Sequence, residues 1–303
     1  MSTSKFSNLA YVVPVMDSFV LPASRVIGAV TVPLACLFLY FLYFYQRAFA
    51  KNLPAHAASS FMPLTSYTWH TIVYNYCSFV ASAILFIGIN MYYEFSSAKY
   101  VSALFIVLTF VIICSTSSYQ WIISIISIQR FWNKSQLEAN RVKWTQNSVR
   151  TLMIVVAVPI VVKELVVWCR LLYVLLDPEP VEEFFYPRIY FVFFVHAGIY
   201  LLQQIILIIA MICELSTSAP ATGHSEYLLS NHTKYIGIVK TAFFLTFIWS
   251  WNADYYPFVI YFALIGVDLF LVPLIVEVTE VNSKPNIVMP NGNTIMHPLG
   301  AWS

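Results

Sequence analysis

The feature that most constrains this chain is a stretch of thirty residues, Tyr100 to Gln129, that contains no Asp, Glu, Lys or Arg. A helix of about 20 apolar residues is long enough to cross the hydrocarbon core of a bilayer. Only 10% of the sequence is charged and 60% is hydrophobic, whereas a soluble domain carries roughly 25% charged residues. So few charges cannot cover a water-exposed surface, and the composition therefore indicates a lipid bilayer as the surroundings. The net charge of +2 gives no indication of a nucleic-acid partner.

Further apolar stretches are separated by short polar or charged segments. Together they predict an all-α membrane protein with seven transmembrane spans, at residues 26–46, 67–93, 101–128, 151–174, 190–213, 235–251 and 257–278. The sixth span is the weakest because it is short and contains Lys240. A six-span chain is the alternative.

The distribution of Lys and Arg predicts the orientation of the bundle. With the N-terminus outside, the cytoplasmic segments hold nine Lys or Arg residues, and the external segments hold five if Arg170, near the external end of the fourth span, is included. Short loops rich in these residues stay cytoplasmic, and residues 130–150 alone supply five of the nine. We therefore expect an extracellular tail (1–25), a bundle (26–278) and a short cytoplasmic tail (279–303), the arrangement of a G-protein-coupled receptor.

The sequence lacks the motifs of common enzyme and cofactor sites. Gly-x-Ser-x-Gly, a Walker loop and Cys-x-x-Cys are absent. No two of the six histidines have the spacing that places two metal ligands on one helix face. We therefore expect no enzyme activity, no cofactor and no metal site. The five cysteines lie in or beside apolar runs, where we expect small buried side chains rather than disulfides.

Five short motifs occur in order along the chain: "FMPLTSYTWH", "SIISIQRF", "VVKELVV", "TKYIGIVKT" and "GVDLFLVPLIVEVTEVNSKPN". They resemble segments of the nematode serpentine chemoreceptors, and most of all their Srz class. The resemblance implies a plasma-membrane receptor, expected in sensory-neuron cilia, that binds a small molecule and activates a heterotrimeric G protein. A seven-span ligand-gated channel or transporter is the alternative function, and a non-signalling membrane scaffold is a third. The N-terminus separates the first two, because insect-type odorant channels place it inside.

The triplet Gln129-Arg130-Phe131 ends the charge-free stretch. It resembles the acidic-Arg-aromatic ending of the third helix in rhodopsin-like receptors, with Gln129 in the acidic place. A glutamine can hydrogen-bond the neighbouring arginine but cannot form an ion pair with it. The resemblance implies that this triplet contacts the G protein, together with Arg141 and Lys143 of the basic loop. The alternative is an interfacial arginine whose guanidinium reaches the lipid phosphates.

A ligand pocket is expected beside the third span. Ser115, Thr116 and Tyr119 recur at spacings that place them on one helix face. Hydroxyl and aromatic groups on one face suit a small molecule, and we add Ile112 and His196 of the fifth span to this pocket. Packing between helices is the alternative, because Ser and Thr are common at such interfaces.

Asp268 lies near the middle of the seventh span, five residues before Pro273. A charge inside the bilayer costs a few kcal/mol and usually has a partner, while the proline permits a kink. Lys240 of the sixth span is within reach, so we predict an Asp268–Lys240 pair that biases the inactive state. Alternatively, Lys240 extends to the cytoplasmic headgroups and Asp268 binds water or stays protonated.

Lys163 and Glu164 lie near the middle of the fourth span. Adjacent residues on a helix point about 100° apart. We therefore expect each to make its own contact in the interior, either in helix packing or with a ligand.

Overall fold

The structure is a computed structural model that describes residues 9–81, 98–136, 141–176, 182–217, 223–251 and 257–283. Most side chains are described within residues 33–81, 107–136, 141–169, 198–217, 223–245 and 268–283. Within these ranges every regular element is a helix and there is no strand. The prediction of an all-helical protein is therefore confirmed.

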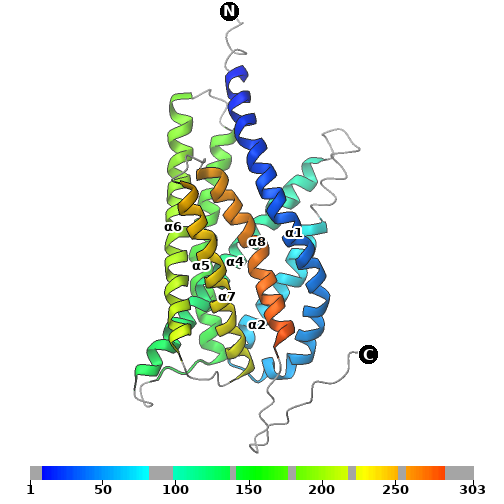
Figure 1. The fold of residues 1–303 in the computed structure, drawn as a ribbon, viewed down its shortest axis with the longest axis vertical. Coiled ribbons are helices and arrows are strands. Elements are labelled where there is room, and N and C mark those ends of the chain that lie inside the picture. The colour runs from blue at the N-terminus through cyan, green and yellow to red at the C-terminus, as the bar shows by residue number, and fades with distance from the viewer. Residues whose placement is uncertain are drawn as a thin grey trace, which may run out of the picture.

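The helices form one bundle, with the start of α1 at one end and the end of α8 at the other (Figure 1). The elements are α1 (Leu9–Ala57), α2 (Met62–His70), the π-helical turn η1 (Thr71–Tyr76), α4 (Ala98–Ser135), α5 (Gln146–Leu176), α6 (Glu182–Ser216), α7 (His224–Trp251) and α8 (Pro257–Asn282). Each expected apolar span falls on one or more of these elements, apart from residues 82–93 of the second span, which lie outside the described residues.

The helices extend beyond the apolar spans. The helix of the weak sixth span begins at His224 instead of near residue 235, and α1 begins at Leu9, within the segment expected to be a tail. An apolar run marks only the part of a helix that can lie in the hydrocarbon core of a bilayer. A helix satisfies its own backbone hydrogen bonds and can therefore continue through polar turns.

Local sequence explains where several helices begin. Thr145 Oγ1 accepts a hydrogen bond from the Ser148 backbone N at 3.2 Å, and Ser148 Oγ accepts one from the Thr145 backbone N at 2.9 Å. This reciprocal cap satisfies two backbone donors at the start of α5. The first helical residue of α8 is Pro257, whose fixed φ suits that position.

The central helix of the bundle is α4, which contacts α5, α6, α7, α8 and η1 (Figure 1). On another side of the bundle, α1 packs along α8. The main hydrophobic cluster fills the space between these elements, around Ile123 and Ile126 of α4, Tyr45 of α1, Leu64 of α2 and Ile236 of α7. The functional residues described below are therefore held between rigid, mutually packed helices.

Polar side chains face the interior of the bundle, while large apolar side chains face outward. On α6, Gln203 and Glu214 are buried, whereas Leu202, Ile209 and Ile212 are exposed. The exposed side of α5 consists of valine and leucine side chains, at Val155, Val158, Val162, Leu165 and Val166. A protein surrounded by water usually has apolar side chains inside and polar side chains outside, because burying polar groups away from water costs free energy.

Two of the described helical stretches, Val107–Lys134 and Gly198–Ser216, are long and apolar enough to cross a bilayer. Length and composition alone give this weak indication of membrane association. The arrangement of seven spans stays a prediction.

All five cysteines are free. Cys114 is buried, as expected, but Cys36 and Cys169 are exposed. The expectation of burial was wrong for these two because an apolar run does not tell which side of its helix faces the bundle.

Candidate functional site

Arg130, near the end of α4, is held by acidic residues of two other helices. Its Nη1 donates to both carboxylate oxygens of Glu214 on α6, at 3.0 and 3.2 Å. Glu214 Oε2 also accepts a hydrogen bond from Ser230 Oγ of α7 at 2.6 Å. Arg130 Nε lies 3.9 Å from Oε1 of Glu226, in the first turn of α7. We call these four residues the Arg130 clamp, because they tie α4, α6 and α7 together.

The clamp is largely withdrawn from solvent. The Arg130 side chain is 13% exposed and that of Glu214 is 2% exposed. Removing one partner of a buried ion pair costs about 3–5 kcal/mol, because it leaves an uncompensated charge. Glu226 is more exposed and is too distant for a hydrogen bond, so it contributes less.

The other residues expected at the coupling surface, Gln129, Phe131, Arg141 and Lys143, are not part of the clamp. The hydrogen bond that the sequence allows between Gln129 and Arg130 is not formed, because Gln129 Oε1 is buried without a partner among the described residues. Adjacent residues on a helix point toward different neighbours, which explains why the two side chains separate. Phe131, Arg141 and Lys143 are exposed.

A second polar group occupies the interior where α4, α6, α7 and α8 meet. Lys240 Nζ donates to Asp268 Oδ2 at 2.6 Å and to Gln120 Oε1 at 2.6 Å. Tyr200 OH donates to Asp268 Oδ2 at 3.3 Å, and Gln203 Nε2 donates to Gln120 Oε1 at 3.2 Å. The structure thus brings together the predicted partners Lys240 and Asp268, and Lys240 does not extend to the headgroups. Whether the pair biases an inactive state stays a prediction.

We call Lys240, Asp268, Gln120, Gln203 and Tyr200 the central network. The sequence analysis predicted the contact between Lys240 and Asp268 but not the part that the other three residues take in it. Gln120 and Gln203 supply oxygens and amide protons, and the Tyr200 ring lies 5.0 Å from Lys240 Nζ, where a cation–π attraction adds to the pairing. The two glutamines could have been identified from the sequence, because a glutamine within an apolar run needs a polar partner in the bundle interior.

Lys163 and Glu164 contact each other. Lys163 Nζ lies 2.5 Å from Glu164 Oε1, and Glu164 is buried. The sequence analysis did not predict this ion pair, which forms because the flexible four-carbon stem of lysine spans the angle between adjacent positions.

A cavity lies between α2, η1, α4 and α8. Its volume is about 20 Å³, which has room for about one water molecule and is far below the usual range for ligand pockets. Three predicted pocket residues, Ser115, Thr116 and Tyr119, line it together with Pro273. The other lining residues are Tyr67, Thr68, Thr71, Ile72, Tyr76, Val272 and Val276.

The remaining pocket predictions have different outcomes. Ile112 does not line this cavity but is buried in the main hydrophobic cluster. It was assigned by position along the helix, which does not determine which way the side chain points. His196 lies outside the residues whose side chains are described.

Two hydroxyl groups of the cavity wall join helices. Tyr119 OH lies 2.5 Å from His232 Nδ1 of α7, and Thr116 Oγ1 lies 3.3 Å from Tyr76 OH of η1. These contacts and the small volume of the cavity fit the helix-packing alternative in this structure. One wall is the π-helical turn η1, a distortion that is frequent at functional sites.

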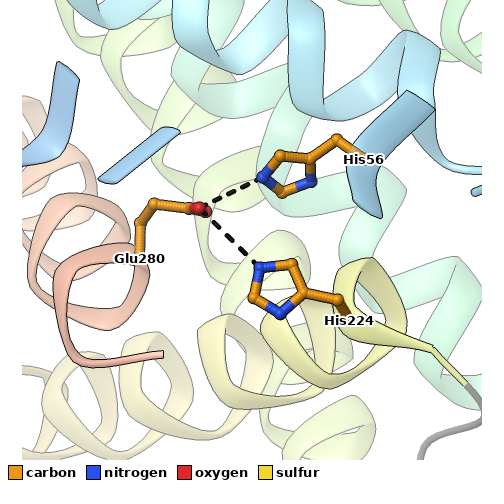
Figure 2. A group of neighbouring side chains, drawn as sticks. All are labelled: His56, His224 and Glu280. Atoms are coloured by element: carbon orange, nitrogen blue, oxygen red, sulfur yellow. Dashed lines mark hydrogen bonds and ion pairs between the residues drawn. The ribbon is translucent and has the colours of Figure 1, made fainter. Parts of the chain in front are cut away.

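A group of buried polar side chains that the sequence analysis missed joins α1, α7 and α8. Figure 2 shows the rings of His56 and His224 directed at the carboxylate of Glu280. The Nε2 atoms of His56 and His224 lie 3.1 and 3.9 Å from Glu280 Oε1. Asn52 Nδ2 donates to this oxygen at 2.9 Å, and Ser225 Oγ lies 3.1 Å from His56 Nδ1. We call these five residues the histidine cluster.

The carboxylate of the cluster is charged. Burial by itself raises the pKa of Glu280, but the adjoining His224 and His56 imidazoles and the Asn52 amide lower it to about 2. Glu280 is therefore an anion at neutral pH.

Histidine spacing within single helices could not reveal this cluster, because its members lie on three helices. The one available signal was the topology. The predicted spans place residues 47–66, 214–234 and 279–303 on the same side, and these segments contain His56, His224 and Glu280.

Comparisons with known proteins add no identification. A scan against models of protein families, a search of curated proteins and a search of solved structures each gave no match. The resemblance to nematode serpentine chemoreceptors therefore rests on the short sequence motifs alone.

Proposed function

We propose that this chain is a seven-span membrane receptor of the serpentine type, with its N-terminus outside, that binds a small molecule and signals to a heterotrimeric G protein. The observation that carries the proposal is the Arg130 clamp, in which an arginine at the end of the central helix is held by Glu214 of α6 and Glu226 of α7. The resemblance of the sequence motifs to nematode chemoreceptors gives independent support.

The membrane part of the proposal is supported by the distribution of side chains. The outward sides of α5 and α6 are covered by aliphatic residues. Inside, Lys240 of α7 is paired with Asp268 of α8, and Gln203 of α6 with Gln120 of α4. Lipid favours this distribution, because an unpaired polar group is costly in hydrocarbon and an aliphatic surface is not.

In the proposed mechanism the clamp holds the closed, inactive arrangement. When α6 and α7 move away from α4, Arg130 separates from Glu214 and its guanidinium becomes free to bind carbonyl or carboxylate groups of the G protein. A ligand favours this open arrangement only to the extent that it binds it more tightly than the closed one.

The central network provides a route from a ligand to the clamp. Tyr200 and Gln203 of the network and Glu214 of the clamp all lie on α6, whereas Lys240 and Glu226 lie on α7. At about 1.5 Å per residue, these groups are about 17–21 Å apart along each helix. A change at the network that tilts either helix would therefore displace the clamp.

The test is a screen of small molecules for G-protein nucleotide exchange in cell membranes that contain the chain. We expect a ligand to stimulate exchange through the wild type and through Lys134→Ala, and not through Arg130→Ala at equal surface expression. Lys134 is the matched control because it is an exposed cation in the last turn of α4, outside the clamp.

Two results would contradict the proposal. A ligand-gated current that persists without G proteins would indicate the channel or transporter instead. A tag on Met1 that antibodies reach only after permeabilisation would exclude the proposed orientation.

A further inference from the structure

We propose that the histidine cluster binds a divalent transition-metal ion of the zinc type, with His56 Nε2, His224 Nε2 and a carboxylate oxygen of Glu280 as ligands. Nothing in the proposed receptor function requires this site.

The three ligand atoms are close enough to share one ion. All lie within 4.8 Å of one another, and Glu280 Oε1 is 3.1 and 3.9 Å from the two nitrogens. Tetrahedral zinc with bonds of about 2.1 Å places its ligands about 3.4 Å apart. Binding therefore needs only small movements of the side chains shown in Figure 2.

A buried nitrogen that makes no hydrogen bond within the described part of the chain, and that faces Glu280 Oε1 at 3.9 Å, also points to a ligand. The His224 side chain is only 4% exposed, yet His224 Nε2 makes no hydrogen bond with the described residues. Leaving a buried polar atom unsatisfied is costly, so such atoms call for a physical explanation. An ion between this nitrogen and Glu280 would satisfy both groups.

Neighbouring residues orient two of the ligands as in known metal sites. Ser225 Oγ lies 3.1 Å from His56 Nδ1, and by accepting the Nδ1 proton it would leave the Nε2 lone pair free for the ion. Asn52 Nδ2 donates to Glu280 Oε1 at 2.9 Å. Such outer contacts set the tautomer and position of metal ligands.

The ligand set indicates the class of ion. Two imidazoles and one carboxylate, with a fourth position left for water, suit zinc and related divalent transition metals. Mg²⁺ and Ca²⁺ prefer sites made of oxygen alone.

The site would fasten three helices. His56 lies in the last turn of α1, His224 is the first residue of α7, and Glu280 lies near the end of α8. Because Glu226 of the clamp follows His224 by two residues, an ion here would hold the start of α7 in place. This consequence rests on the proposed function, in which α7 must move to release Arg130.

The test uses the full-length chain, purified in detergent, freed of metal with a chelator and titrated with Zn²⁺ against a chromophoric zinc indicator. We expect about one ion per chain, affinity at least about 100-fold weaker in His224→Gln and His56→Gln, and about 10-fold weaker in Ser225→Ala. His70→Gln is the matched control, because His70 is an exposed histidine on α2 outside the cluster. Absence of Zn²⁺ binding by the folded wild type, or equal binding by His224→Gln, would overturn the site.

Co²⁺ spectroscopy of the wild type keeps the test independent of variants that fold poorly. We expect the visible bands of tetrahedral cobalt with nitrogen and oxygen ligands, whereas a thiolate charge-transfer band would assign the ion to a cysteine and overturn the proposal.

G-protein nucleotide exchange in the same preparation separates the two proposals. Its absence would contradict the receptor function and leave the binding result intact, while Zn²⁺ that binds without lowering basal exchange would overturn the predicted restraint on α7.

Discussion

Replacing Glu214 with glutamine tests the Arg130 clamp most directly. The amide keeps the size of the side chain and can still accept a hydrogen bond from Arg130 and the one from Ser230 Oγ, which is 2.6 Å long in the wild type. The change removes the negative charge that faces Arg130 Nη1 at 3.0 Å. Only the closed arrangement is destabilised, because Arg130 and Glu214 are apart when the helices separate.

The expected magnitude follows from the burial of the pair. Removing one partner of a buried ion pair costs about 3–5 kcal/mol. The retained hydrogen bond and Glu226, at 3.9 Å from Arg130 Nε, offset part of this cost, which leaves about 2 kcal/mol. At about 1.4 kcal/mol per factor of ten, the equilibrium shifts about 30-fold toward the open arrangement. A receptor that is about 1% open would become about 20–25% open.

The assay is basal nucleotide exchange by the G protein on membranes that contain equal amounts of receptor. We expect Glu214→Gln to raise basal exchange about 20-fold. Glu226→Gln should raise it less than about twofold, because a distant and partly exposed pair contributes little, and Lys134→Ala should leave it unchanged. Basal exchange at the wild-type level in Glu214→Gln, with the response to ligand intact, would refute the role assigned to the clamp.

Two further predictions concern stability, each measured as the midpoint of thermal unfolding in detergent. Gly237→Ala should destabilise the bundle by about 1–3 kcal/mol, because a Cβ at Gly237 would lie 2.7 Å from Met211 Cβ of α6. Gly198→Ala is the control and should not lower the unfolding midpoint, since a Cβ at Gly198 meets nothing within 4 Å. An equal fall in the midpoint for both variants would contradict the close approach of Gly237 to Met211. Lys240→Met should cost about 3 kcal/mol by leaving Asp268 uncompensated, and adding Asp268→Asn should restore most of it. If the double variant is as unstable as Lys240→Met alone, the loss of stability does not come from leaving Asp268 without its partner.

The sequence predicted those parts of the structure that depend on neighbours in the chain. Where their residues are described, the long apolar runs lie on helices. The pairing of Lys240 with Asp268 was also predictable, because a charge in an apolar run needs a partner and their spans follow one another in the chain.

Contacts between distant helices could not be predicted in the same way. Glu214 lies 84 residues after Arg130, at the end of an apolar run, where an acidic residue is equally expected to face water. Ile112 was assigned to the pocket and is instead in the hydrophobic core. Both cases depend on the rotation of a helix about its axis, which a nearly uniform apolar sequence does not indicate.

By itself, the sequence determined that the described part of the chain is helical, where its apolar segments lie, and that the few charges within those segments need partners. These properties depend on local hydrogen bonding and on the free energy of burying each side chain. Only the tertiary structure decided which polar groups of different helices meet: Arg130 with Glu214, and His56 and His224 with Glu280. Those pairings depend on how the helices pack and rotate against one another and on how far flexible side chains reach, and no single segment of the chain contains that information.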